Sequence, residues 1–275
     1  MTWDVLGAGL VGSFLGAAGA AGGVVTRTGS PVTAQVRLPG GELRNWAPRP
    51  TLLSGRQPLL LACRAHHTPW SEVAGRTVLA AQNGLGQPVP LLVCFMALDR
   101  DAGGCIAARG VAPRLVLARP VAAWEPVLAA WTAAGLTVET VDDARPAQWE
   151  KAILNATVGP LCFATGLGMA EVWADASWRA GVLAATLEGG RIAAAAGITL
   201  RPGHVARAEE FFARVGAHRP SVLKDPGELP WILGALLAVA ARYGVTCPAL
   251  VRIAGQVAQT GQSSHTALAS LGAVP

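Results

Sequence analysis

The stretch WDVLGAGLVGSFLGAAGAAGGVVTRT, residues 3–28, decides the fold of the first part of the chain. Residues 3–6 predict a short strand, the Ala- and Gly-rich residues 10–19 predict a helix, and residues 23–26 predict a second strand. A glycine-rich turn that joins a strand to a helix at the start of such a unit is typical of Rossmann-type sheets.

Three glycines in this turn, Gly7, Gly9 and Gly12, have the spacing of the dinucleotide fingerprint. The first allows a tight turn, the second lets a pyrophosphate approach the backbone, and the third lets the helix pack closely on the strand. The helix would begin at Leu10, and its positive dipole end would face the phosphates. The alternative is a segment that is merely rich in glycine. Because the turn lies between two predicted strands, we favour cofactor binding by Gly7, Gly9, Leu10 and Gly12.

The end of the second predicted strand indicates which dinucleotide would bind. NAD-binding sheets usually carry Asp or Glu there, which accepts a hydrogen bond from the ribose 2′-hydroxyl. This strand ends in Thr26-Arg27-Thr28, and no acidic residue follows before Glu42. Because a guanidinium at this turn suits a 2′-phosphate, we expect NADP (NADPH) with Arg27 as the phosphate-binding residue. A solvated surface arginine is the alternative.

The composition is that of a folded protein: 52% of the 275 residues are hydrophobic, 14% are charged, and the net charge is +5. This excludes a disordered polar chain, and the charge is too small and too dispersed to indicate nucleic acid binding. The uncharged residues 5–25 are long enough to cross a bilayer, but seven of them are glycine and no basic residue precedes them. We therefore expect no membrane segment.

The five cysteines are scattered, without a Cys-x-x-Cys pair. This pattern predicts reduced thiols in a cytoplasmic protein rather than disulfides or a zinc site. The adjacent His66 and His67 side chains would point apart on a strand, and no acid or cysteine completes a site with them, so we expect no metal.

Strand and helix signals alternate along the first half of the chain, up to a polar, proline-containing stretch at 142–148. Further strands are predicted at 34–38, 42–46, 58–63, 77–81, 114–118 and 136–141, and helices at 91–98 and 124–134. Beyond the polar stretch, helices are predicted at 149–165, 171–197, 203–215 and 228–243. The expected fold class is therefore α/β. A Rossmann-type doubly wound sheet over residues 1–145 is followed by an all-α domain over residues 146–275.

Three further segments occur in order after the fingerprint. They are Ala81-Gln82-Asn83-Gly84-Leu85-Gly86, Trp149-Glu150-Lys151 with Asn155, and Ser221 to Asp225 followed by Glu228, Gly234, Gly244 and Pro248. With these motifs the chain resembles the ketopantoate reductase (2-dehydropantoate 2-reductase) family over nearly its whole length. The resemblance implies an oxidoreductase of pantothenate biosynthesis. Such an enzyme reduces the C2 ketone of a small 2-keto acid with NADPH, in a cleft between two domains. A homodimer is also expected.

The resemblance assigns a role to each motif residue. It implies that Lys151 is the general acid and that Glu228 is a second catalytic residue. A lysine in a partly desolvated site can stabilise and protonate a developing alkoxide, and the chain has only one other lysine, Lys224. The implied substrate-binding residues are Asn83, Asn155 and Ser221, and the implied cofactor-binding residues beyond the fingerprint are Arg64 and Asn83.

Structural alternatives remain for each of these residues. Asn83 could serve an Asn-Gly turn, and Asn155 could bond to its own helix. Ser221 could cap a helix, Glu228 could favour a helix dipole, and Arg64 could be a surface residue.

The chain departs from the family pattern on the substrate side. Gly159 occupies the position of a second substrate-binding Asn, Pro230 and Leu233 replace polar residues, and the spacer between Asp225 and Glu228 is short. Missing polar partners change which substrate hydroxyls can be satisfied. Two alternatives therefore stay open: a non-catalytic NADP-binding or regulatory protein, and a related dehydrogenase with another substrate.

Overall fold

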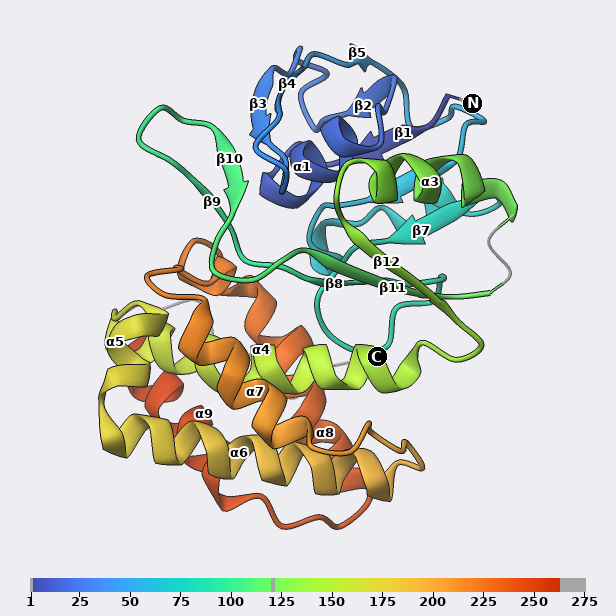
Figure 1. Cartoon of the computed structure of the whole chain (residues 1–275). Coiled ribbons are helices and arrows are strands. Elements are labelled where there is room, and N and C mark those ends of the chain that lie inside the picture. The colour runs from blue at the N-terminus through green and yellow to red at the C-terminus, as the bar shows by residue number, and fades with distance from the viewer. Residues whose placement is uncertain (1, 120–121, 263–275) are drawn as a thin grey trace. The chain divides into compact units, whose positions relative to one another are not determined.

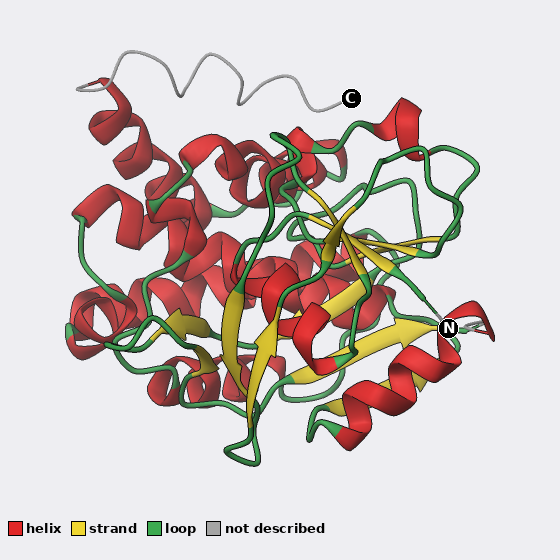
Figure 2. Ribbon diagram, turned by 90° about the horizontal axis from the view of Figure 1, so that it is seen from above, coloured by secondary structure: helices red, strands yellow, loops and turns green. Residues whose placement is uncertain are grey.

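A computed structural model describes residues 2–119 and 122–262 of the chain (Figure 1). The chain divides into two compact units. The Rossmann unit comprises Met1–Gln82 and Gln87–Ala144, and the helical unit comprises Asn83–Gly86 and Arg145–Pro275. The strands belong to the first unit and the long helices to the second, so the expected α/β class with a helical C-terminal region is confirmed. Figure 2 shows the strands in yellow and the helices in red.

The central sheet of the Rossmann unit has five parallel strands in the order β5-β2-β1-β6-β7. Its members are β1 Asp4–Leu6, β2 Gly23–Val25, β5 Arg49–Pro50, β6 Leu59–Leu61 and β7 Val78–Ala80. All residues of β1, β2, β6 and β7 are buried, as expected for strands covered on both faces. Helix α1, Leu10–Ala18, connects β1 to β2.

Two smaller sheets complete the described part of this unit. One has the order β4-β3-β10-β9 and contains the predicted hairpin, in which β3 Ala34–Arg37 pairs antiparallel with β4 Leu43–Trp46. The other has the order β12-β11-β8. The remaining elements are β8 Leu92–Phe95, β9 Leu98–Arg100, β10 Ile106–Ala108, β11 Arg114–Ala118, β12 Thr137–Val141, α2 Trp70–Val73 and α3 Glu125–Ala133.

The helix predicted at 91–98 is wrong, because this segment forms strands β8 and β9. A short run of apolar residues fits a buried strand and a buried helix equally well, so periodicity could not separate them. Pairing decided the outcome: β8 lies antiparallel to β11, with Phe95 opposite Arg114. The Arg114 guanidinium also lies 4.1 Å from the centroid of the Phe95 ring.

Tryptophan side chains hold the C-terminal end of α1. The last carbonyl groups of a helix have no partner within it. Indole N–H groups donate to carbonyl oxygens at and just beyond this end, from Trp131 to Leu15 (2.9 Å), from Trp3 to Gly19 (3.0 Å) and from Trp46 to Ala21 (3.1 Å). Trp3 and Trp131 also meet edge to face, 5.9 Å between centroids. These large rings are thus buried with their polar atoms satisfied.

The helical unit is built around α4, Arg145–Thr165, which packs against α6 and α9. Its other helices are α5 Met169–Ala174, α6 Ala176–Ala195, α7 His204–Arg214, α8 Ala235–Arg242 and α9 Pro248–Gln262. Short turns between α7 and α8 are η3 Ser221–Leu223, η4 Pro226–Glu228 and the π-helical η5 Pro230–Gly234. Within residues 2–119 and 122–262, no helix has the length and hydropathy that a membrane span requires.

Helix α9 was missing from the sequence prediction, and its N-terminus explains why. The carboxylate of Glu188, on α6, accepts hydrogen bonds from the backbone N–H groups of Ala249 and Leu250, both at 2.9 Å. A helix start is usually signalled by a local capping residue. Here the cap comes from about sixty residues upstream, where no local pattern reveals it.

Glu188→Ala should destabilise the protein, because Glu188 is only 4% exposed and two charge-assisted hydrogen bonds would be lost. We expect the free energy of unfolding to fall by about 2–4 kcal/mol in urea denaturation. Glu188→Gln keeps one acceptor oxygen, so its free energy of unfolding should fall by less than that of Glu188→Ala. A Glu188→Ala protein as stable as the wild type would show that α9 does not depend on this cap.

Candidate functional site

The three fingerprint glycines differ in what a side chain would meet. Gly7 has φ +100°, and a Cβ there would lie 2.7 Å from the backbone nitrogen of Cys63. A Cβ on Gly12 would lie 1.9 Å from the carbonyl oxygen of Gly7. The protein's own packing therefore requires glycine at both positions. Gly9 is different, because its φ is −71° and a Cβ there would meet nothing within 4 Å.

The open space beside Gly9 lies at the N-terminus of α1, since Gly9 is the residue that caps this helix. The first N–H groups of a helix have no partner within it, and the dipole makes this end positive. Such an end binds phosphate readily. The fold does not require glycine at position 9. A pyrophosphate does require it, because a side chain there would keep the phosphates away from the backbone. The residues present therefore fit a dinucleotide.

The two arginines predicted for cofactor binding both follow strands of the central sheet. Arg27 is exposed in the turn after β2, and Arg64 is partly buried in the loop after β6. Gln82 stabilises that loop, because its side-chain amide donates to the Thr68 hydroxyl (2.7 Å) and to the Cys63 carbonyl (2.9 Å).

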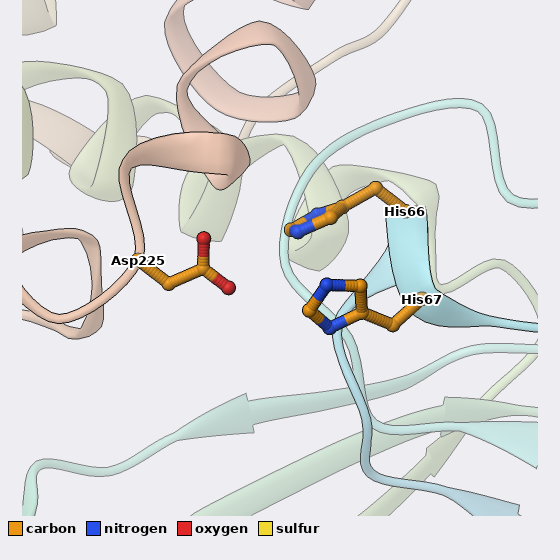
Figure 3. Close-up of side chains that lie close together, drawn as sticks. All are labelled: His66, His67 and Asp225. Carbon is orange, nitrogen blue, oxygen red and sulfur yellow. The ribbon is translucent and has the colours of Figure 1, made fainter. Parts of the chain in front are cut away.

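Figure 3 shows two histidines of the Rossmann unit and one aspartate of the helical unit. His66 and His67 lie in the turn η1, Ala65–His67, with ring centroids 4.1 Å apart. Asp225 caps η4, where its side chain accepts from the backbone N–H of Gly227 (3.1 Å).

Side chains predicted for the substrate form one hydrogen-bonded chain in the helical unit. The Asn155 side-chain amide donates to Asn83 Oδ1 (2.9 Å), and Asn83 Nδ2 lies 3.4 Å from Glu228 Oε1. The Ser221 hydroxyl donates to Glu228 Oε2 (2.7 Å). The Glu228 carboxylate is buried. Four residues from distant parts of the sequence thus meet in one network.

Lys151 lies one helical turn before Asn155 and on the same face of α4. Its Nζ lies 6.0 Å from the centroid of the Phe211 ring. The neighbouring Glu150 is buried and pairs with Arg201 (3.2 Å) and with Arg207. These two arginines therefore compensate the carboxylate that adjoins Lys151 in the sequence.

The positions that depart from the family pattern are apolar in the structure. A Cβ on the buried Gly159 would lie 3.4 Å from Val222 Cγ1 and 3.9 Å from Pro220 Cβ. Leu233 is buried, and Pro230 begins the π-helical turn η5. The region one turn beyond Asn155 on α4 is therefore closed by hydrocarbon.

Cysteine chemistry has no support among the described residues. All five cysteines are free, and burial raises the pKa of the Cys162 thiol to about 12. Burial also raises the pKa of Cys63, near the fingerprint turn. Both thiols are protonated at neutral pH and are poor nucleophiles.

One residue near the network was missed by sequence reasoning. The Gln148 side-chain amide donates to the carbonyl oxygen of Gly84 (3.3 Å). Its spacing from Lys151 and Asn155 on one helix face was visible in the sequence. Its partner on a distant loop was not.

Comparisons with known proteins address the helical unit directly. Residues 143–260 match the family model described as ketopantoate reductase PanE/ApbA C terminal. The resemblance to ketopantoate reductases is confirmed. A search of curated proteins finds no match.

Solved structures share the ketopantoate reductase fold over nearly the whole chain. A 2-dehydropantoate 2-reductase from Methylococcus capsulatus is 20% identical with a TM-score of 0.76, covering 98% of this chain and 99% of that one. The same enzyme from Geobacter metallireducens GS-15 is 23% identical with a TM-score of 0.74, covering 93% and 99%. A D-mandelate dehydrogenase, in a ternary structure with NADH and anilino(oxo)acetate, is 19% identical with a TM-score of 0.76, covering 96% and 99%.

Proposed function

We propose that this protein is an oxidoreductase that reduces the C2 ketone of a small 2-keto acid with a nicotinamide dinucleotide. The observation that carries the proposal is the network of Asn83, Asn155, Ser221 and Glu228, on the unit whose helix α4 also bears Lys151. The lysine and the amide donors suit the ketone and the carboxylate of such a substrate, and the Glu228 carboxylate suits a substrate hydroxyl that donates to it. Matched structures that act on such substrates support the same reaction class.

The Rossmann unit would hold the cofactor. Gly7, Gly9 and Gly12 with the first turn of α1 would bind the pyrophosphate, and Arg64 would bind near the adenosine phosphate. When bound, the reduced dinucleotide supplies a hydride, which carries two electrons, to the C2 carbon of the keto acid.

Lys151 would supply the matching proton. As C2 receives the hydride, its carbonyl oxygen becomes an alkoxide, and Lys151 Nζ protonates this oxygen to give the 2-hydroxy acid. Asn155, one turn away, would donate a hydrogen bond to the same oxygen or orient the lysine. Glu228 and Ser221 would hold the rest of the substrate.

Ketopantoate is the first substrate to test, although the apolar surroundings of Gly159 and Leu233 favour a related one. A matched pair of acids distinguishes a ketopantoate site from a site for a related substrate. The pair is ketopantoate and 3,3-dimethyl-2-oxobutanoate, which lacks only the 4-hydroxyl. Sites built to bind a hydroxyl reject its deoxy analogue by about 10⁴–10⁵-fold, whereas apolar sites discriminate by about 10²-fold. The test is reduced-dinucleotide oxidation by purified protein with each acid. Tight dinucleotide binding without turnover of either acid, or of a wider panel, would favour the non-catalytic alternative.

We propose NADPH rather than NADH as the cofactor, with Arg27 as the residue that binds the 2′-phosphate. A charge-assisted contact contributes about 1.5–3 kcal/mol, so Arg27→Ala should raise the KM for NADPH about 10–100-fold. The KM for NADH should not change. Arg252→Ala, at an exposed arginine of α9, is the control. An equal effect on both dinucleotides would contradict the assignment.

We also propose a cytoplasmic homodimer associated through the helical unit. Leu187, Tyr243 and Val251 are exposed large hydrophobic side chains of this unit that an interface would bury. A matched ketopantoate reductase from Staphylococcus aureus, 15% identical, is described as dimeric.

A further inference from the structure

We infer that Gln148 is a positioning residue that fixes the Asn83-Gly84 turn along the Lys151 face of α4. The inference rests on the proposed function, in which Asn83 and Lys151 act on the same substrate. It assigns a role to a side chain that neither the fingerprint nor the family motifs include.

Gln148, Lys151 and Asn155 lie on one face of helix α4. Positions 148, 151 and 155 are three and four residues apart, so their side chains leave the helix on one face. Gln148 donates to the Gly84 carbonyl (3.3 Å), and Asn155 donates to Asn83 Oδ1 (2.9 Å). The residues before and after Lys151 on this face therefore both bind the same two-residue turn.

On its other side, the Asn83-Gly84 turn packs against η5. Gly84 is buried with φ +97°, and a Cβ there would lie 2.3 Å from the carbonyl oxygen of Trp231 in η5. Asn83 in turn extends toward Glu228. The turn is thus packed between α4 and the η4–η5 segment, with no room for a side chain at position 84.

The Gln148 side-chain amide is a neutral hydrogen-bond donor. The Gly84 carbonyl can only accept, so its partner on α4 must donate, and the Gln148 amide donates without adding a charge beside Lys151. Gln148 is partly buried, so its bond to the carbonyl is sheltered from water. Losing this donor would leave Asn155 as the remaining described hydrogen bond from α4 to the turn, so the Asn83 amide would be held less firmly relative to Lys151.

The test compares Gln148→Met, which keeps the side-chain length but removes the donor, with Gln259→Met at an exposed position of α9. A small misplacement of catalytic groups can cost about 10²-fold, so we expect kcat/KM for the keto acid to fall about 10–100-fold. The loss should appear mainly in kcat, and the KM for the dinucleotide should stay within about twofold of wild type. Gln259→Met should behave as wild type.

Hydrogen–deuterium exchange of the peptide containing residues 83–86 gives a readout that does not need turnover. It should exchange faster in Gln148→Met than in wild type, while the thermal midpoint stays close to that of Gln259→Met. If the wild type shows no activity but the peptide still exchanges faster in Gln148→Met than in wild type, the positioning contact stands and the proposed function fails. Unchanged exchange, or unchanged kcat in an active enzyme, would overturn the inference. Gln148→Ala, with the same readouts, replaces the methionine variant if that fails to fold.

Discussion

Lys151→Met should lower kcat for reduction of the 2-keto acid by about 10²–10⁴-fold, which is the usual contribution of a general acid. Methionine keeps the length of the side chain and removes the ammonium group, so the alkoxide would lose its proton donor. The dissociation constant of the dinucleotide, measured by fluorescence titration, should stay close to wild type because Lys151 belongs to the helical unit.

The chain offers a matched control for this variant. Lys224 is the only other lysine in the sequence and is exposed, so Lys224→Met should leave kcat unchanged. In Lys151→Ala, added methylamine should restore part of the rate by supplying an ammonium group. Full activity of Lys151→Met, or an equal loss in Lys224→Met, would remove Lys151 from the chemistry.

Gly9→Ala and Gly12→Ala should separate cofactor binding from folding. Gly9 has an ordinary φ and open space around its Cβ position, so Gly9→Ala should fold with a wild-type thermal midpoint. The added methyl would occupy the space we assign to the pyrophosphate. We therefore expect the dissociation constant of NADPH to rise tenfold or more, which corresponds to about 1.4 kcal/mol.

Gly12→Ala should behave differently. Its Cβ would lie 1.9 Å from the Gly7 carbonyl oxygen, and a backbone atom cannot move aside cheaply. We expect the Rossmann unit to lose about 3 kcal/mol of stability or more in thermal or urea unfolding. If the Gly9→Ala protein folds and binds NADPH as tightly as the wild type, then no phosphate of the cofactor lies beside Gly9.

Local chemistry explains which parts of the fold the sequence predicted. The β1-α1-β2 unit has its strands, turn glycines and helix within residues 4–25, so neighbouring residues carry the whole signal. Strand β8 was misread because its partner β11 lies about twenty residues away. Helix α9 was missed because its cap, Glu188, comes from another helix.

The candidate site divides in the same way. Each motif residue could be named from its own segment, but the hydrogen bonds that join Asn83, Asn155 and Glu228 span up to 145 residues of sequence. The assignment of Asn83–Gly86 to the helical unit was also invisible, because the segment follows a strand of the Rossmann unit. Long-range packing, rather than propensity, brings these groups together.

Transfer of a hydride from a nicotinamide dinucleotide to C2 of a 2-keto acid can be followed by isotope labelling. The measurement uses NADPH that carries deuterium at both positions on C4 of the nicotinamide ring, with the purified protein and each acid of the matched pair. Mass spectrometry of the product would show where the deuterium lies. We expect a 2-hydroxy acid with deuterium on C2, formed by the wild type and formed about 10²–10⁴-fold more slowly by Lys151→Met. Reduced dinucleotide that binds but delivers no deuterium to any 2-keto acid tested would contradict it.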